Sequence, residues 1–196
     1  MSNHHTAGLL LAGLLLSQPA LALNLKSTVT EVDRVPVPRA NYRAPNDPNM
    51  IFYLQRSTNA NTIVYAANML KRGQIDPDKP VHVYWRLFDE DGRTLELTFF
   101  QRFAAYGMRA DPVEGHPGSF EASIVAYPNL KLRIGVDGSG APEATLDMQG
   151  HKARAVSAYV QLNESGLVPS LVYMDVYGID KASGHILHEH FEPAKD

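Results

Sequence analysis

The sequence predicts an all-β domain, an antiparallel sandwich or barrel of about eight to ten strands. Apolar and polar residues alternate with a period of two, most clearly from Val81 to Phe88. Short segments of this kind recur at regular spacing and are separated by glycine-containing turns such as Lys181 to Gly184. No long amphipathic helical pattern is present. A chain of 196 residues is also long enough to bury the core of one domain.

Residues 1–22 are predicted to be a cleaved signal peptide. The apolar run from Ala7 to Leu16 is followed by the small-residue triplet Ala20-Leu21-Ala22, and cleavage is expected after Ala22. The alternative is an uncleaved anchor, but a membrane span needs ~20 apolar residues. Because the chain has no cysteine, we expect the periplasm of a bacterium rather than a disulfide-built extracellular module.

Residues 23–49 are predicted to be an extended polar arm. The segment shows neither helical nor strand periodicity and contains Pro36, Pro38, Pro45 and Pro48, which fix φ and remove backbone donors. The run from Val35 to Pro38 could be a polyproline-type ligand for a protein partner, although a simple lead-in to the domain is the more common case.

Residues 50–196 are predicted to form a single β domain. The apolar runs Ile51 to Leu54 and Ile63 to Ala67 predict two strands, and a hairpin is expected around Asp91-Gly92. Residues 103–108 fit either a strand or one helical turn. The strands that form and follow this hairpin are expected at 81–88, 94–99, 120–126, 130–136, 144–148, 154–162, 171–179 and 186–191.

Three stretches of the chain resemble a bacterial family known as domain-of-unknown-function family 4833. They are FYLQRSTNANTIVYAAN (Phe52 to Asn68), the region from DP-x-x-PVHVYW to QR-x-x-AYG (Asp76 to Gly107), and YMDVYGID with its following glycine (Tyr173 to Gly184). The resemblance covers most of the predicted mature chain. It implies a secreted or envelope domain without an assigned activity, so the function has to be inferred from the residues themselves.

Composition excludes several classes of function. The formal net charge of -3 is dispersed along the chain, whereas surfaces that bind nucleic acid or acidic membranes are strongly basic. The absence of cysteine excludes thiolate nucleophiles and cysteine-ligated zinc. No cofactor is predicted.

The leading functional hypothesis is non-catalytic binding of a small organic or anionic ligand of the cell envelope. Two guanidinium groups facing one another across a shared opening would clamp a carboxylate or phosphate, and aromatic side chains would wall the site. The residues predicted to bind this ligand are Arg56, Asn59, Asn61, Trp85, Arg102 and Tyr106. The alternative is that the two asparagines build a turn, the arginines pair with carboxylates and the aromatic residues belong to the core.

A metal site is a further possibility near the C-terminus. His188 and His190 would share one face of a strand, and Asp175 from the preceding strand could be a third ligand. Glu189 would lie on the opposite face, and the spacing is not that of a helical metalloprotease motif. We therefore keep the two histidines as candidates without predicting a bound metal.

Catalysis has little support in the sequence, and no catalytic residue is predicted. No serine lies in a Gly-x-Ser-x-Gly motif. The second hypothesis is a hydrolase or metal-dependent enzyme that uses His82 as a base or the pair His188 and His190. The third is a structural or protein-interaction module of the envelope that uses a sheet edge or the arm.

Overall fold

The computed structural model describes residues 25–38, 41–71, 73–165 and 170–193. The predicted signal peptide lies outside the described residues. Within them no helix is long and apolar enough to cross a membrane.

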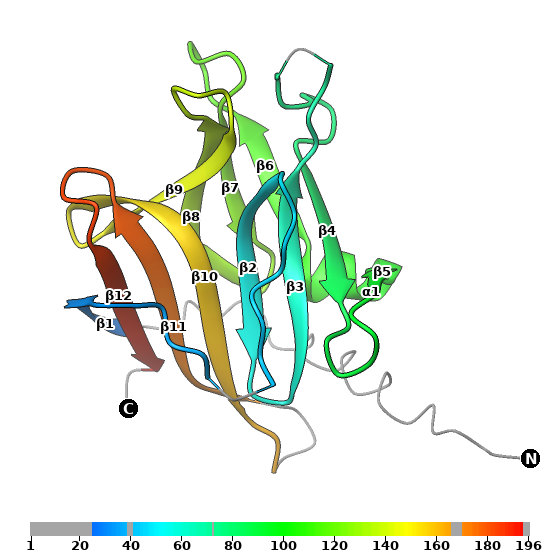
Figure 1. The fold of residues 1–196 in the computed structure, drawn as a ribbon, viewed down its shortest axis with the longest axis vertical. Coiled ribbons are helices and arrows are strands. Elements are labelled where there is room, and N and C mark those ends of the chain that lie inside the picture. Colours follow the sequence, from blue (N-terminus) through cyan, green and yellow to red (C-terminus); the bar gives the residue numbers. More distant parts are fainter. Residues whose placement is uncertain (1–24, 39–40, 72, 166–169, 194–196) are drawn as a thin grey trace, which may run out of the picture.

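The predicted all-β class is confirmed, and the described strands form one mixed sheet that curls into a half-barrel (Figure 1). The sheet has twelve strands rather than about eight to ten. In chain order the elements are β1 (Leu25–Val32), β2 (Met50–Arg56), β3 (Asn59–Ala67), β4 (Val81–Arg86), β5 (Thr94–Glu96), helix α1 (Phe99–Gln101), π-helix η2 (Arg102–Tyr106), β6 (Met108–Pro112), β7 (Phe120–Ile124), β8 (Tyr127–Val136), β9 (Pro142–Met148), β10 (His151–Asn163), β11 (Ser170–Asp180) and β12 (Ile186–Pro193).

The long strand β10 is the branch point of the sheet. Along one edge it pairs with β11, which continues to β12 and β1, and along the other edge it pairs first with β9 and then with β2. Figure 1 shows β10 between β11 and β2. The β2–β10 pairing is parallel, whereas the other ladders between the described strands are antiparallel. A purely antiparallel sheet was predicted, so this pair is a departure from that prediction.

The predicted extended arm differs from the structure in its first part. Residues 25–32 form β1, an edge strand that pairs antiparallel with β12 over its whole length. Polar side chains are common on edge strands, and Val29 is the member of β1 that packs against the core, which explains why the strand has no clear apolar alternation. Beyond β1 the chain crosses the sheet towards β2 (Figure 1): Tyr42 packs on Tyr159 of β10, and its hydroxyl donates to the carbonyl of Arg56.

The segment 103–108 contains the helical turn that was one of its two predicted forms. Thr98 caps α1 and forms a reciprocal capping box with Gln101, and η2 continues to Tyr106. Gly107 follows the last residue of the helix, and only glycine fits there, because a Cβ at that position would lie 1.8 Å from the carbonyl oxygen of Arg102. The glycine therefore permits the close backbone approach between η2 and β6.

The main hydrophobic core occupies one face of the sheet, which we call the inner face, and two smaller buried clusters lie around Tyr159 and Val64. Its largest fully buried side chains include Tyr65, Phe52, Leu54, Ile124 and Met174. Along β11, Met174 and Val176 point to this face, so their alternate neighbours point to the opposite side, the outer face. Candidate sites lie on both faces.

Candidate functional site

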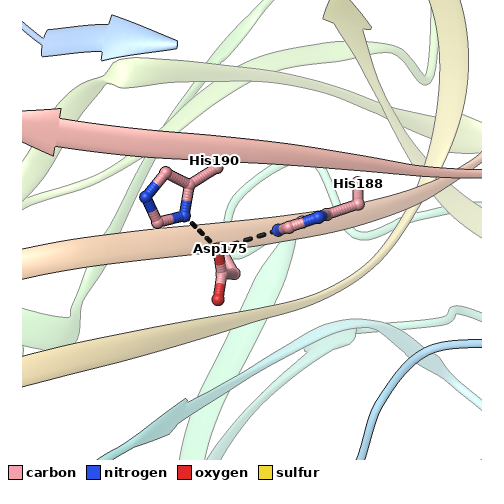
Figure 2. A group of neighbouring side chains, drawn as sticks. All are labelled: Asp175, His188 and His190. Carbon is pink, nitrogen blue, oxygen red and sulfur yellow. Dashed lines mark hydrogen bonds and ion pairs between the residues drawn. The ribbon is translucent and has the colours of Figure 1, made fainter. Parts of the chain in front are cut away.

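The outer face of β11 and β12 carries a compact cluster of Asp175, His188 and His190 (Figure 2). Asp175 lies directly opposite His190 in the antiparallel pairing, and Tyr177 lies opposite His188. Leu187 belongs to the core, so alternation directs both histidines outward. The hairpin thus brings together the two histidines and the aspartate that the sequence proposed as candidate ligands.

One carboxylate oxygen joins the cluster. Oδ1 of Asp175 lies 2.6 Å from Nδ1 of His190 and 2.8 Å from Nε2 of His188, as the dashed lines in Figure 2 mark. The three side chains are 15%, 33% and 23% exposed for Asp175, His190 and His188. The hydrogen bond to Asp175 is the main cause that raises the pKa of His190, and Glu192 acts in the same direction.

Aromatic rings hold the two imidazoles. Tyr177 stacks on His188 with ring centroids 4.8 Å apart and planes 12° apart, and Tyr173 lies 5.2 Å from His190. On the far side of its ring, Nε2 of His190 is 3.3 Å from a carboxylate oxygen of Glu192. Burial, followed by the charge of Asp175, raises the pKa of both tyrosines, so they are neutral hydroxyl groups at physiological pH.

This arrangement fits a divalent transition-metal ion. The donor atoms of Asp175, His188 and His190 lie within 4.8 Å of one another. Metal–ligand bonds of about 2.0–2.1 Å in a tetrahedron place ligand atoms about 3.3 Å apart. The two distances from Oδ1 of Asp175, 2.6 Å and 2.8 Å, would therefore open by less than about 1 Å. Imidazole and carboxylate ligands suit zinc, copper, nickel and iron. A carboxylate on the second nitrogen of a ligating histidine is the usual outer partner, and Glu192 occupies that position.

A groove of about 530 Å³ adjoins the cluster. It is lined by His188 and Tyr177 and by Glu31, Asp33 and Arg34, from the end of β1 and the residues that follow it. His188 therefore belongs both to the cluster and to the wall of the groove. A small molecule in the groove would lie beside a metal held by the three ligands.

Of the residues predicted to bind a ligand, Arg56, Trp85 and Tyr106 are brought together. Nη1 of Arg56 donates to the hydroxyl of Tyr106 at 3.1 Å, and the guanidinium carbon is 5.1 Å from the centre of the Trp85 ring. Arg102 has a different partner: its Nη2 is 3.2 Å from a carboxylate oxygen of Glu96, and its side chain is 57% exposed. The described residues thus place the two arginines in separate interactions rather than in a shared clamp.

Asn59 and Asn61 follow the alternative that the sequence offered, which is a turn. Oδ1 of Asn59 accepts from the backbone N–H of Asn61 at 3.1 Å, and Oδ1 of Asn61 accepts from the N–H of Asp89 at 3.1 Å. Asp89 in turn accepts from Ala60 at 3.2 Å. These bonds tie the β2–β3 turn to the loop between β4 and β5.

His82, the candidate base, lies 2.7 Å from Glu96 at an exposed position.

Four residues near these clusters were not identified from the sequence. Tyr177 and Glu192 share the face of the proposed ligands, and the period of two along their strands would have indicated them. Tyr127, on β8, lies near Arg56, and Tyr65, on β3, lies near Tyr106 and Tyr127. The approach of β8 to β2 depends on the curl of the whole sheet, for which the sequence carries no local signal.

A family profile described as "Domain of unknown function (DUF4833)" matches residues 52–190. The match contains Arg56, Trp85, Tyr106 and all three members of the outer cluster, and it ends at His190. No curated protein and no solved structure matches the chain.

Proposed function

The chain belongs to the DUF4833 family, and we propose that it binds a divalent first-row transition-metal ion through Asp175, His188 and His190. The observation that carries this proposal is the convergence of three donor atoms within 4.8 Å on the outer face. Two imidazoles and one carboxylate leave at least one coordination position for water or another small ligand, as in catalytic zinc sites.

Burial separates this cluster from the ordinary ion pairs of the surface. His82 and Glu96 form a pair whose side chains are 43% and 62% exposed, and such pairs contribute little. In the outer cluster the corresponding exposures lie between 15% and 33%. Holding two imidazoles against one carboxylate oxygen restricts three side chains at once, and this costs conformational entropy. A cation coordinated by the same atoms would offset that cost.

A metal-dependent reaction is the second candidate function, and the groove beside His188 is the observation that favours it. The chemistry supplied by a bound zinc ion is the activation of a water molecule. Arg34, which also lines the groove, would orient an anionic group of the substrate.

We also propose that the protein is exported to the periplasm and cleaved after Ala22. The support is the signal-peptide pattern and the lack of cysteine. Intact-mass measurement of the protein recovered from a periplasmic fraction should give a chain that begins at Leu23. A full-length chain found in the cytoplasmic fraction would contradict export.

Calorimetric titration of an untagged, chelator-treated chain tests the metal site. Zn²⁺ should bind with one ion per chain, and Co²⁺ should give the visible absorption of a low-coordinate complex. The double variant His188→Ala/His190→Ala should lose this binding. The control is His82→Ala/His185→Ala, which removes two exposed histidines that pair with Glu96 and Glu31 and should bind as the wild type does.

Two outcomes would contradict the proposal. One is a wild-type chain that binds none of Zn²⁺, Co²⁺ and Cu²⁺ above the level of the double variant. The other is equal loss of binding in the control variant, which would assign the ions to scattered surface histidines. Circular dichroism of each variant checks that the sheet is intact.

A further inference from the structure

We propose that the inner-face cluster of Arg56, Tyr65, Tyr106 and Tyr127 binds the carboxylate of a small organic acid against the ring of Trp85. This site is separate from the metal site on the outer face and does not depend on it.

Arg56 is a cation placed on the apolar face of the sheet. Phe52 and Leu54, which precede it at alternate positions of β2, are both core residues. Its Nε atom is buried and has no hydrogen-bond partner among the described residues. The guanidinium instead packs on the rings of Trp85 and Tyr106, at 5.1 Å and 6.0 Å from their centres.

The charge of Arg56 therefore lacks a balancing anion. Among the described residues no carboxylate lies within ion-pair distance of it, whereas Arg93 has two such partners and Arg102 has one. Transferring a charge into an apolar environment is costly unless an opposite charge or strong hydrogen bonds compensate it. A bound anion of one negative charge would supply both.

Tyr65 provides a second unpaired donor on the inner face. Its side chain is fully buried, and its hydroxyl has no hydrogen-bond partner among the described residues. Burial raises the pKa of Tyr65, and Tyr106 and Tyr127 raise it further. Burial likewise raises the pKa of Tyr127, which the charge of Arg56 partly opposes. Tyr65 is thus linked to Arg56 through Tyr106, whose hydroxyl accepts from the guanidinium, and through Tyr127.

The cluster contains donors in excess of acceptors. A guanidinium can only donate, and a neutral phenol can donate one hydrogen bond. An oxyanion accepts several such bonds, and a carboxylate matches the planar guanidinium. We choose a carboxylate over a phosphate dianion because one cation balances one charge, and because aromatic rings suit an organic body attached to it.

The surrounding structure holds the cluster in position. The indole N–H of Trp85 donates to the side-chain oxygen of Gln101 at 3.4 Å, which joins β4 to the helical turn. The rings of Trp85 and Tyr106 meet edge to face at 5.3 Å. Gly107, where only glycine fits, follows Tyr106 at the end of η2.

A cleft between β4 and β6 offers a route of entry. It has a volume of about 610 Å³ and is lined by Val83 and Met108, which lie two residues from Trp85 and Tyr106 along the chain. Arg102, which pairs with Glu96, also lines this cleft, as do Asp78 and Lys79.

The fluorescence of Trp85 tests the proposal directly, because the chain contains one tryptophan. Benzoate, acetate and inorganic phosphate are titrated separately into the full chain in the presence of a chelator. Benzoate should give a saturable change in Trp85 emission and a higher melting temperature. Tyr65→Phe should weaken benzoate binding about tenfold or more, and Arg56→Met about a hundredfold or more.

The matched control is Arg109→Met, an exposed arginine of β6, which should bind benzoate as the wild type does. If Arg56→Met fails to fold, Tyr65→Phe decides, because it removes a single atom. The proposal is overturned if neither carboxylate changes the emission of the wild type at millimolar concentration, or if Tyr65→Phe binds as tightly as the wild type. A response to phosphate alone overturns the carboxylate assignment.

Discussion

The outer cluster and the inner cluster make opposite demands on an ion. Asp175 holds two imidazoles around one oxygen on the outer face, so its atoms are ready to accept a cation. On the inner face, Nε of Arg56 and the hydroxyl of Tyr65 are buried donors without an acceptor among the described residues, which suits an anion. Two polar clusters on the two faces of one sheet thus predict ligands of opposite charge, and each can be removed without touching the other.

Asp175→Asn should have the largest effect, a loss of Zn²⁺ affinity, and this effect should be confined to the outer cluster. The amide keeps the shape of the side chain but loses the negative charge that the metal requires, so Zn²⁺ affinity should fall about a hundredfold or more. The response of Trp85 to benzoate should stay unchanged, because Arg56 lies on the opposite face. Calorimetry and fluorescence on the same sample measure both. If benzoate binding weakened as well, the two clusters would be coupled and the comparison would fail.

A pH titration should distinguish the two clusters, because Zn²⁺ affinity should depend on pH and benzoate affinity should not. The hydrogen bond to Asp175 raises the pKa of His190, so this ring holds a proton up to a higher pH than an ordinary histidine. Metal binding displaces that proton, and Zn²⁺ affinity should fall up to about tenfold for each pH unit below the raised pKa.

The inner cluster has no group that titrates in this range. Arginine stays charged, and the pKa values of Tyr65 and Tyr127 are raised by burial, so both phenols stay neutral. Benzoate affinity should therefore be constant between about pH 5 and pH 8. A fall of benzoate affinity in parallel with that of Zn²⁺ would show that one protonation governs both sites.

The sequence predicted the outer cluster because its geometry is local. Alternation along one strand fixes that His188 and His190 share a face, and the turn from Lys181 to Gly184 brings Asp175 beside them. The same reasoning identified the all-β class, and it gave the turn at Asn59 as the alternative to ligand binding. It failed for β1, whose polar residues belong to a sheet edge that is defined only by the partner strand β12.

The inner cluster could be predicted only in part because it is assembled from five separate segments of the chain. Arg56, Trp85 and Tyr106 were grouped by residue type. Tyr65 lies on β3, which pairs with β2 and β4, whereas Tyr127 comes from β8 and joins them through the curl of the sheet. Arg102 was assigned to the same opening as Arg56. The π-helix instead exposes Arg102 and buries Tyr106, a rotation that strand alternation cannot anticipate.

Tyr65→Phe should have the smallest effect, a change in the free energy of unfolding, and the sign of that change is informative. In the ligand-free chain the hydroxyl of Tyr65 is buried without a partner, so removing it should stabilise the fold by about 1 kcal/mol, since unsatisfied buried groups cost roughly 1–3 kcal/mol. At saturating benzoate the gain should vanish or reverse, because the hydroxyl then donates to the carboxylate. Urea unfolding with and without benzoate measures the difference.

Tyr84→Phe is the matched control for the change in the free energy of unfolding that Tyr65→Phe causes. The hydroxyl of Tyr84 donates to Asp47, so its loss should destabilise the fold by about 1 kcal/mol whether or not benzoate is present. If Tyr65→Phe destabilised the ligand-free chain in the same way, its hydroxyl would already be satisfied within the protein. The inner cluster would then be a closed polar network without a place for an anion. The metal site on the outer face would remain as the one proposed ion site of the two.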